Sequence, residues 1–169
     1  MTVQYDDTQQ SNDAQQPAGG TTVRCGIDVA AGAERAFSVF TDGINEWWHP
    51  DHHVQPGKLR RVAIEPQVGG RVLEESETGD VCTWGRVLTW DPPRTFAFSW
   101  QIGTDWGAPA PDAPASRVTV TFTPTDTGTR VELVHDRLDV HGTGWEKLRD
   151  TVASEGGWKG LLHRFASAA

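Results

Sequence analysis

The chain has 169 residues and a net charge of −8, and its length suits one domain that can bury its own core. The acidic balance opposes contact with phosphate backbones, so we expect no nucleic-acid partner. No apolar stretch is long enough to cross a membrane as a helix, and the first 20 residues lack the basic and apolar parts of a secretory signal. We therefore expect a cytoplasmic protein in which Cys25 and Cys82 are reduced.

Residues 1–20 differ in composition from the rest of the chain. They are rich in Gln, Asp and Gly and offer too little apolar surface to offset the entropy cost of ordering, so we predict a disordered tail. Residues 21–169 are predicted to form a single domain. It begins with residues 21–29, where apolar and polar side chains alternate as in a half-buried strand.

Two short helices are predicted after this strand. Residues 33–40 place apolar side chains around one helical face, and a second short helix ends near Trp47 and Trp48, just before Pro50. Adjacent side chains on a helix point about 100° apart, so we expect at most one of the two tryptophans to lie fully in the core. The other is predicted to line a cavity, cover a seam or face water.

Six further strands are predicted, at residues 58–65, 71–76, 81–90, 95–102, 117–123 and 129–136. The last three carry apolar side chains at alternating positions, which predicts an antiparallel sheet covered on one face only. The residues expected on the covered face are Phe96, Phe98, Trp100, Val118, Val120, Phe122, Val131, Leu133 and His135. The facing of strand 81–90 stays open, because Val87 and Leu88 compete for the inner side.

The predicted cover of the sheet is the C-terminal segment. Trp145 and Trp158 begin two apolar stripes at helical spacing, and the pair Gly156-Gly157 lies between them. Two glycines inside a helix cost about 2 kcal/mol relative to alanine, so either the helix breaks there or packing holds it together. We favour one long, bent helix with a void opposite the glycines.

Several motifs together resemble one known superfamily. Residues 30–37 (AAGAERAF), the pair Trp47-Trp48, and residues 85–94 (GRVLTWDPPR) are similar to its motifs, as are the FSW at 98–100, the VELVH at 131–135 and the GWKGLL at 157–162. On these residues the chain resembles the START/Bet v-type superfamily and its Aha-type branch, named for an activator of a heat-shock chaperone ATPase. The resemblance implies an α+β helix-grip fold: a seven-stranded, curved antiparallel sheet wrapped on a long C-terminal helix, with two short helices after the first strand.

The resemblance and the eight tryptophans predict an apolar ligand cavity between the sheet and the C-terminal helix. Its ligand would be a lipid, a polyketide or an aromatic metabolite, bound without a cofactor. The expected ligand-binding residues are Trp47, Trp48, Phe98, Trp100, Phe122, Leu133, His135, Trp145, Gly156 and Trp158. The alternative is that the tryptophans fill a solid core. Trp106, in the Pro- and Ala-rich segment 103–116, is either an anchor for that loop or a lid over the cavity.

Two other functions stay open. Some members of the superfamily catalyse cyclisation or hydrolysis, and His135 is the best candidate base here, although a lone buried histidine is more often a hydrogen-bonded core residue. We favour binding over catalysis. The resemblance also admits a chaperone-associated interaction protein or a weak homodimer. His49, Asp51, His52 and His53 match no standard zinc spacing, so we expect a solvated loop there and no metal.

Overall fold

Seven antiparallel strands form one curved sheet in the order β1-β7-β6-β5-β4-β3-β2 within residues 20–169, the part of the chain that this computed structural model describes. The tail predicted at residues 1–20 lies outside the described residues except for Gly20. The predicted strands are confirmed, with the bounds β1 Val23–Val29, β2 Leu59–Ile64, β3 Arg71–Ser76, β4 Val81–Asp91, β5 Thr95–Trp100, β6 Ser116–Thr125 and β7 Gly128–Asp136.

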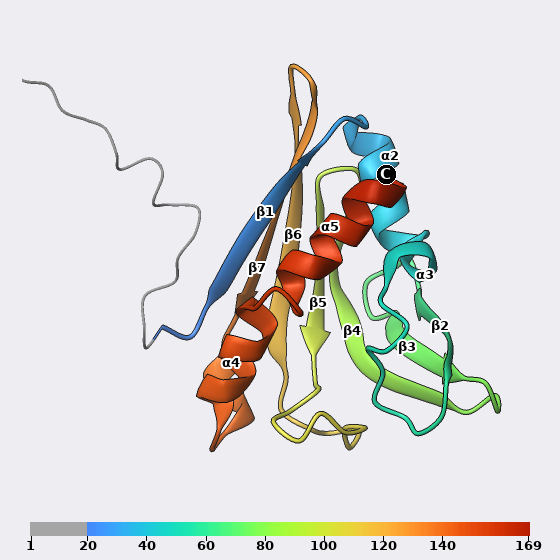
Figure 1. Cartoon of the computed structure of the whole chain (residues 1–169), viewed down its shortest axis with the longest axis vertical. Helices are drawn as coiled ribbons and strands as arrows, with labels where there is room; N and C mark the ends of the chain where they lie inside the picture. The colour runs from blue at the N-terminus through green and yellow to red at the C-terminus, as the bar shows by residue number, and fades with distance from the viewer. Residues whose placement is uncertain (1–19) are drawn as a thin grey trace, which may run out of the picture.

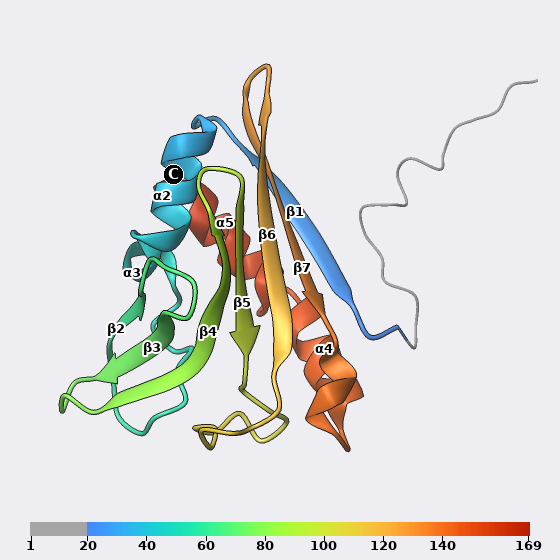
Figure 2. The ribbon, with the colours of Figure 1, turned by 180° about the vertical axis from the view of Figure 1, so that it is seen from behind.

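The helices lie on the concave side of the sheet, where α5 crosses in front of the central strands (Figure 1). Seen from behind, the strands lie in front of α5 (Figure 2). This arrangement confirms the predicted α+β helix-grip fold. The helical elements are α2 Ala33–Thr41, α3 Ile44–Trp47, the short 3-10 turn η1 Leu138–His141, α4 Trp145–Ala153 and α5 Trp158–Ala168.

The core lies between the concave face of the sheet and the helices. Alternation along β5, β6 and β7 turns the predicted apolar residues inward, and pairing places Val118 beside both Phe98 and His135. Each of these three side chains is at most 4% exposed. The alternation read from the sequence therefore identifies the covered face of this half of the sheet correctly.

Strand β4 turns Trp84 and Val87 inward, although their positions are of opposite parity. The pairing of β4 with both neighbouring strands shifts register, between Val72 and Leu73 on β3 and between Val87 and Thr89 on β4 itself. Such irregularities change which residues face the core. The alternation of apolar and polar residues therefore could not predict which side chains of β4 point inward. Leu88 is 45% exposed, and Val87 takes the inner position.

The C-terminal cover consists of two helices, so the prediction of one long, bent helix is wrong. Helix α4 ends at Ala153, and α5 begins at Trp158 after the non-helical Gly157 (φ −102°, ψ −130°). A side-chain carbon on Gly157 would lie 2.3 Å from the carbonyl oxygen of Val152, so the close approach of the two helices requires glycine here. Within residues 20–169, none of the helices has the length and hydrophobicity needed to span a membrane.

Candidate functional site

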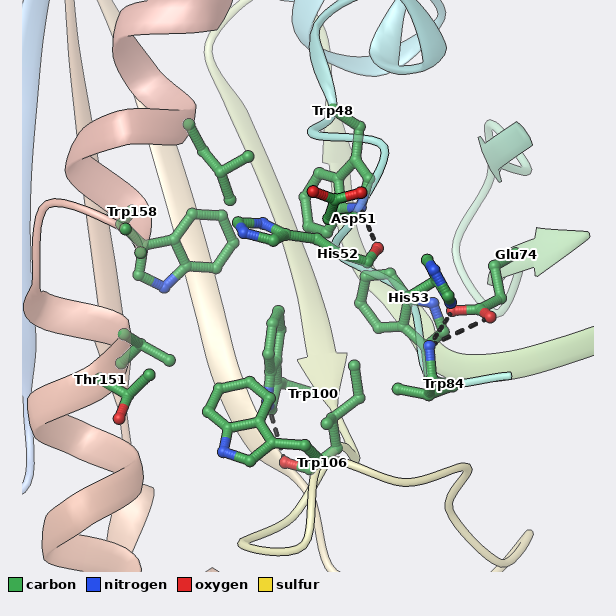
Figure 3. A pocket seen from close by; sticks show the side chains of 16 residues that line it. Trp48, Asp51, His52, His53, Glu74, Trp84, Trp100, Trp106, Thr151 and Trp158 are labelled. Atoms are coloured by element: carbon green, nitrogen blue, oxygen red, sulfur yellow. Dashed lines mark hydrogen bonds between the residues drawn. The ribbon is translucent and has the colours of Figure 1, made fainter. Parts of the chain in front are cut away.

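A pocket of about 290 Å³ opens between the concave face of the sheet and the junction of α4 and α5 (Figure 3). Strands β3, β4 and β5 supply its floor, and the α3–β2 loop, the β5–β6 loop and the two C-terminal helices surround it. Its size is at the lower end of the range of roughly 300–1,000 Å³ that is usual for small-molecule sites.

Five tryptophans line the pocket: Trp48, Trp84, Trp100, Trp106 and Trp158. The rings of Trp48 and Trp84 are stacked with centroids 5.8 Å apart, and Trp84 meets Trp100 edge to face at 5.3 Å. Trp158 meets Trp100 edge to face at 5.6 Å. Aromatic rings at these different angles present both faces and edges, so the wall suits another flat aromatic ring.

Trp47 and Trp48 have different surroundings. Trp47 is a core residue, 2% exposed, packed against Phe40 and Phe165, and its indole N–H donates to the carbonyl oxygen of Val39 at 3.0 Å. Helix α3 ends at Trp47, and the extended backbone of Trp48 turns the second ring into the pocket wall, where it is 7% exposed. Helical spacing therefore does not apply to this pair. Both rings belong to the buried core, contrary to the expectation that at most one would, and only Trp48 also lines the cavity.

The glycine pair of the α4–α5 junction and Trp106 of the β5–β6 loop also line the pocket. Gly156 and Gly157 both line the cavity, so a void does lie opposite them. A side-chain carbon on Gly156 would meet a single neighbour within 4 Å, Ser154 Oγ at 3.9 Å. Trp106 is 42% exposed and has a left-handed backbone (φ 56°), so it lies at the rim of the pocket rather than in the core.

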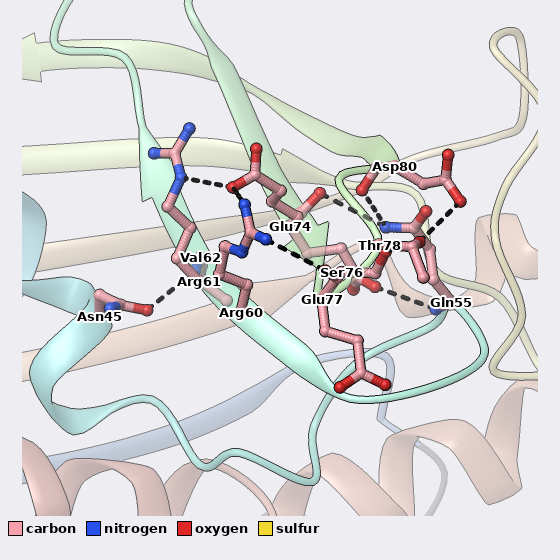
Figure 4. Close-up of polar contacts among 11 residues, drawn as sticks. Asn45, Gln55, Arg60, Arg61, Val62, Glu74, Ser76, Glu77, Thr78 and Asp80 are labelled. Carbon is pink, nitrogen blue, oxygen red and sulfur yellow. Dashed lines mark hydrogen bonds and ion pairs between the residues drawn. The ribbon is translucent and has the colours of Figure 1, made fainter.

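Glu74 supplies a buried carboxylate to the pocket wall, and its residue is 2% exposed. The backbone N–H groups of Val54 and Gln55 each donate to this carboxylate at 2.9 Å. The Gln55 side chain in turn donates to the carbonyl oxygen of Asp80 at 3.1 Å (Figure 4). A buried charge needs such partners, and here they hold the α3–β2 loop against β3 and the β3–β4 turn.

Three histidines of the α3–β2 loop have different roles. His49 Nδ1 accepts a hydrogen bond from the backbone N–H of Asp51 at 3.1 Å, and a ring nitrogen of His53 bonds to the carbonyl oxygen of Gln55 at 2.8 Å. His52 is half-buried and lines the pocket. Burial is the main cause that lowers the pKa of His52 below its usual 6.5, and the nearby His49 lowers it further. Its imidazole is therefore neutral at neutral pH.

His135 lies in the closed core, fully buried and outside the pocket wall. The indole N–H of Trp158 donates to its Nδ1 at 3.1 Å, so the ring proton is on Nε2, which lies 2.8 Å from Ser116 Oγ. Ser116 Oγ is also 2.8 Å from His141 Nε2. Burial lowers the pKa of His135 to about 3. Both ring nitrogens are engaged in the core, so the structure does not support His135 as the catalytic base.

Four of the ten predicted ligand-binding residues line the pocket, and six do not. Trp48, Trp100, Gly156 and Trp158 are in its wall. Phe98, Phe122, Leu133 and Trp47 are packed in the core together with the buried His135. Trp145 is partly buried beneath Arg149, whose guanidinium carbon lies 5.2 Å from the ring centroid of Trp145. The inward face of the sheet extends beyond the cavity, so facing inward does not place a residue in the pocket.

Sequence reasoning missed the polar part of the wall. Glu74 shares the parity of Val72, a signal that could have placed it inside, but a glutamate in a strand is expected on the wet face. Asp51, His52 and His53 were interpreted as a solvated loop, and all three line the pocket. Among residues 20–169, no group of three or more His, Cys, Asp or Glu side chains is placed to hold a metal ion.

Comparison with known proteins agrees with the fold. The family model described as Activator of Hsp90 ATPase homolog 1-like protein matches residues 30–169. A solved anthrahydroquino-γ-pyrone synthase, Txn09, complexed with SUM, is 37% identical with a TM-score of 0.63, and the match covers 91% of this chain and 100% of that protein. A search of curated proteins gave no match.

Two more distant structures show the fold alone. Protein Ms6760 from Mycobacterium smegmatis is 21% identical (TM-score 0.62), with 93% of this chain and 95% of that one covered. The Aha1 dimer from Colwellia psychrerythraea is 15% identical (TM-score 0.59), with 87% and 94% covered. The family match over most of the chain and the 37% identity to the synthase lead to one conclusion: this protein belongs to the family of Activator of Hsp90 ATPase homolog 1-like proteins.

Proposed function

We propose that the chain binds a small, flat, polycyclic aromatic molecule in the pocket between the sheet and the α4–α5 junction. The observation that carries this proposal is the set of five tryptophans around a cavity of about 290 Å³. Their faces and edges match a rigid aromatic ring system better than a flexible lipid chain, which gains nothing from ring stacking. The polar groups Asp51, His52, Glu74 and Thr151 lie in the same wall and suit hydroxyl or carbonyl substituents on such a ring.

A second function, ring closure on the bound molecule, is favoured by one observation. The structure that is 37% identical over 91% of this chain is named a synthase of a γ-pyrone fused to an anthrahydroquinone. That product is flat and polycyclic, the kind of molecule that the tryptophan wall suits. The chaperone-associated role and the weak homodimer stay predictions, and no contact within residues 20–169 argues for either.

The binding proposal is tested by titrating the protein with a hydroxyanthraquinone and following tryptophan emission. Because five of the eight tryptophans line the pocket, we expect strong, saturable quenching at micromolar ligand. Gly156→Leu should abolish saturable quenching, since its side chain enters the cavity. Gly32→Leu is the matched control, because a side chain there meets no atom within 4 Å and Gly32 is not part of the pocket. Equal quenching in both variants would contradict binding at this site.

A further inference from the structure

We propose that His52 is the general base of a ring closure in the pocket, acting on a polycyclic hydroxyarene that carries a 1,3-diketone side chain beside its hydroxyl group. The inference rests on the proposed binding function and on the ring closure proposed as a second function, and it adds a substrate class and a catalytic residue. His52 lies in the pocket wall, and Figure 3 shows its imidazole extending from the α3–β2 loop toward Trp158.

The backbone of His52 is fixed at both of its polar groups. Its N–H donates to the carbonyl oxygen of His49 at 3.0 Å, and its carbonyl oxygen accepts the indole N–H of Trp48 at 2.8 Å. Its ring stacks on His49 with centroids 4.7 Å apart and planes 24° from parallel. A base acts efficiently when its position is set before the substrate arrives, and these contacts set it.

The ring nitrogens of His52 have no hydrogen-bond partner within residues 20–169 and can bond to a ligand. Within residues 20–169, no protein group forms a hydrogen bond with either nitrogen, whereas His53 bonds to Gln55, and both nitrogens of His135 are engaged in the core. A polar group that has no protein partner and faces an aromatic pocket is placed to bond to the ligand.

The charge state of His52 suits a base. Burial is the main cause that lowers its pKa, and the neighbouring His49, Arg164 and His53 lower it further, while Asp51 raises it less than burial lowers it. The imidazole is consequently neutral at neutral pH and can accept a proton. It becomes protonated, and loses this ability, as the pH falls below its lowered pKa.

The carboxylates of the wall are less suited to the role. Both oxygens of Glu74 accept backbone N–H groups of the α3–β2 loop, so taking up a proton would break the contacts that hold this loop. Asp51 lines the pocket but is exposed to water, and an exposed carboxylate is a weak base for a phenol. Asp51 is therefore the alternative candidate for the general base, and the experiment must distinguish it from His52.

The reaction balances without an oxidant, reductant or metal. His52 takes the phenolic proton while the phenol oxygen attacks the distal carbonyl carbon of the diketone, so a C–O bond forms and the carbonyl electron pair moves to its oxygen. The imidazolium returns its proton to that alkoxide, giving a cyclic hemiketal. Loss of the hydroxyl group with a proton from the neighbouring carbon releases one water and leaves a γ-pyrone ring.

The test uses the full chain and two probes. Binding is measured by quenching with a hydroxyanthraquinone, and turnover is measured with a hydroxyanthraquinone that carries an acetoacetyl group beside its hydroxyl. We expect His52→Gln to retain saturable quenching by the first probe, because its amide still offers a hydrogen-bond donor and acceptor in the pocket wall, and to convert the second about 100-fold more slowly or worse. His163→Gln is the control, since His163 is exposed on α5 and is not part of the pocket wall.

A pH profile separates a base from a merely structural residue. Wild-type turnover should fall as the pH drops through the pKa of His52, which lies below 6.5, and this acidic decline should be absent from the residual rate of His52→Gln. Turnover within threefold of wild type in His52→Gln, with loss in Asp51→Asn, would assign the base to Asp51 and overturn the proposal. Binding without any wild-type turnover would also overturn it while leaving the binding function in place. A wild type that does not bind the first probe would instead refute the proposed function.

Discussion

Glu74 shows how one buried side chain can position a whole loop of the pocket. Its carboxylate accepts N–H groups from two consecutive residues, Val54 and Gln55, of the α3–β2 loop. The same loop carries Asp51, His52 and His53 into the wall. The free energy of these charged hydrogen bonds therefore supports the geometry of the site as well as the stability of the fold.

Replacing Glu74 by Gln should destabilise the protein and loosen the pocket. An amide has one oxygen acceptor where the carboxylate has two, so a backbone N–H of Val54 or Gln55 would lose its partner, at a cost of about 1–3 kcal/mol. Urea unfolding measures this loss, and quenching by a hydroxyanthraquinone measures the weaker binding. Glu77→Gln is the control, expected to stay within about 0.5 kcal/mol of wild type because Glu77 is exposed. Equal stability of the two variants would show that the carboxylate does not hold the loop.

At the scale of the elements, the junction between α4 and α5 places its two adjacent glycines in different environments. A side-chain carbon at Gly157 would lie 2.3 Å from the carbonyl oxygen of Val152 and 2.6 Å from that of Thr151. A side-chain carbon at Gly156, which lines the pocket, would meet no atom closer than Ser154 Oγ at 3.9 Å. The sequence alone could not distinguish these two positions, because the helix break that separates their environments depends on how the helices pack on the sheet.

Alanine substitutions should therefore have opposite outcomes at adjacent positions. Gly157→Ala should destabilise the protein by about 1–3 kcal/mol, since neither backbone carbonyl can move without shifting a helix. Gly156→Ala should leave the free energy of unfolding within about 0.5 kcal/mol of wild type and weaken ligand binding, because its methyl occupies part of the cavity. Thermal unfolding of both variants decides the first point. If Gly157→Ala were as stable as wild type, the junction would have to be more adaptable than its geometry indicates.

The sequence predicted the elements better than it predicted the site. Alternation of apolar residues identified the strands and the inner face of β5, β6 and β7. It succeeded there because the pairings of β5 with β6 and of β6 with β7 contain no register shift. It failed at β4, where irregular pairing breaks the alternation, and for the pocket wall, where loops far apart in the chain converge. Glu74 and His52 acquire their roles from that convergence, which no local pattern records.

At the scale of the whole molecule, the buried chain from Trp158 through His135 and Ser116 to His141 joins α5, two strands and η1. It ties the C-terminal cover to the sheet by hydrogen bonds in addition to apolar packing. Folding therefore requires His135 to remain neutral, because its Nδ1 must accept the indole proton of Trp158.

Stability should fall in acid because of His135. Its pKa is about 3 in the folded protein against an ordinary value of 6.5, so the unfolded chain binds more protons between these values. The contribution is complete above pH 6.5 and is lost as the pH falls toward 3, with a slope of up to about 1.4 kcal/mol per pH unit. His135→Gln keeps a donor and an acceptor but does not titrate, so its free energy of unfolding should depend less steeply on pH. Identical slopes from urea unfolding at pH 4–7 would contradict this assignment.

The division of the pocket between strands and loops bears on how this fold can diversify. The tryptophans of β4 and β5 belong to the hydrogen-bonded sheet, whereas His52, Trp106 and Gly156 come from connections between elements. Loops tolerate substitution and changes in length far better than paired strands. A descendant of this chain could consequently exchange one ligand for another by altering three connecting segments, while inheriting the same scaffold and most of its stability unchanged.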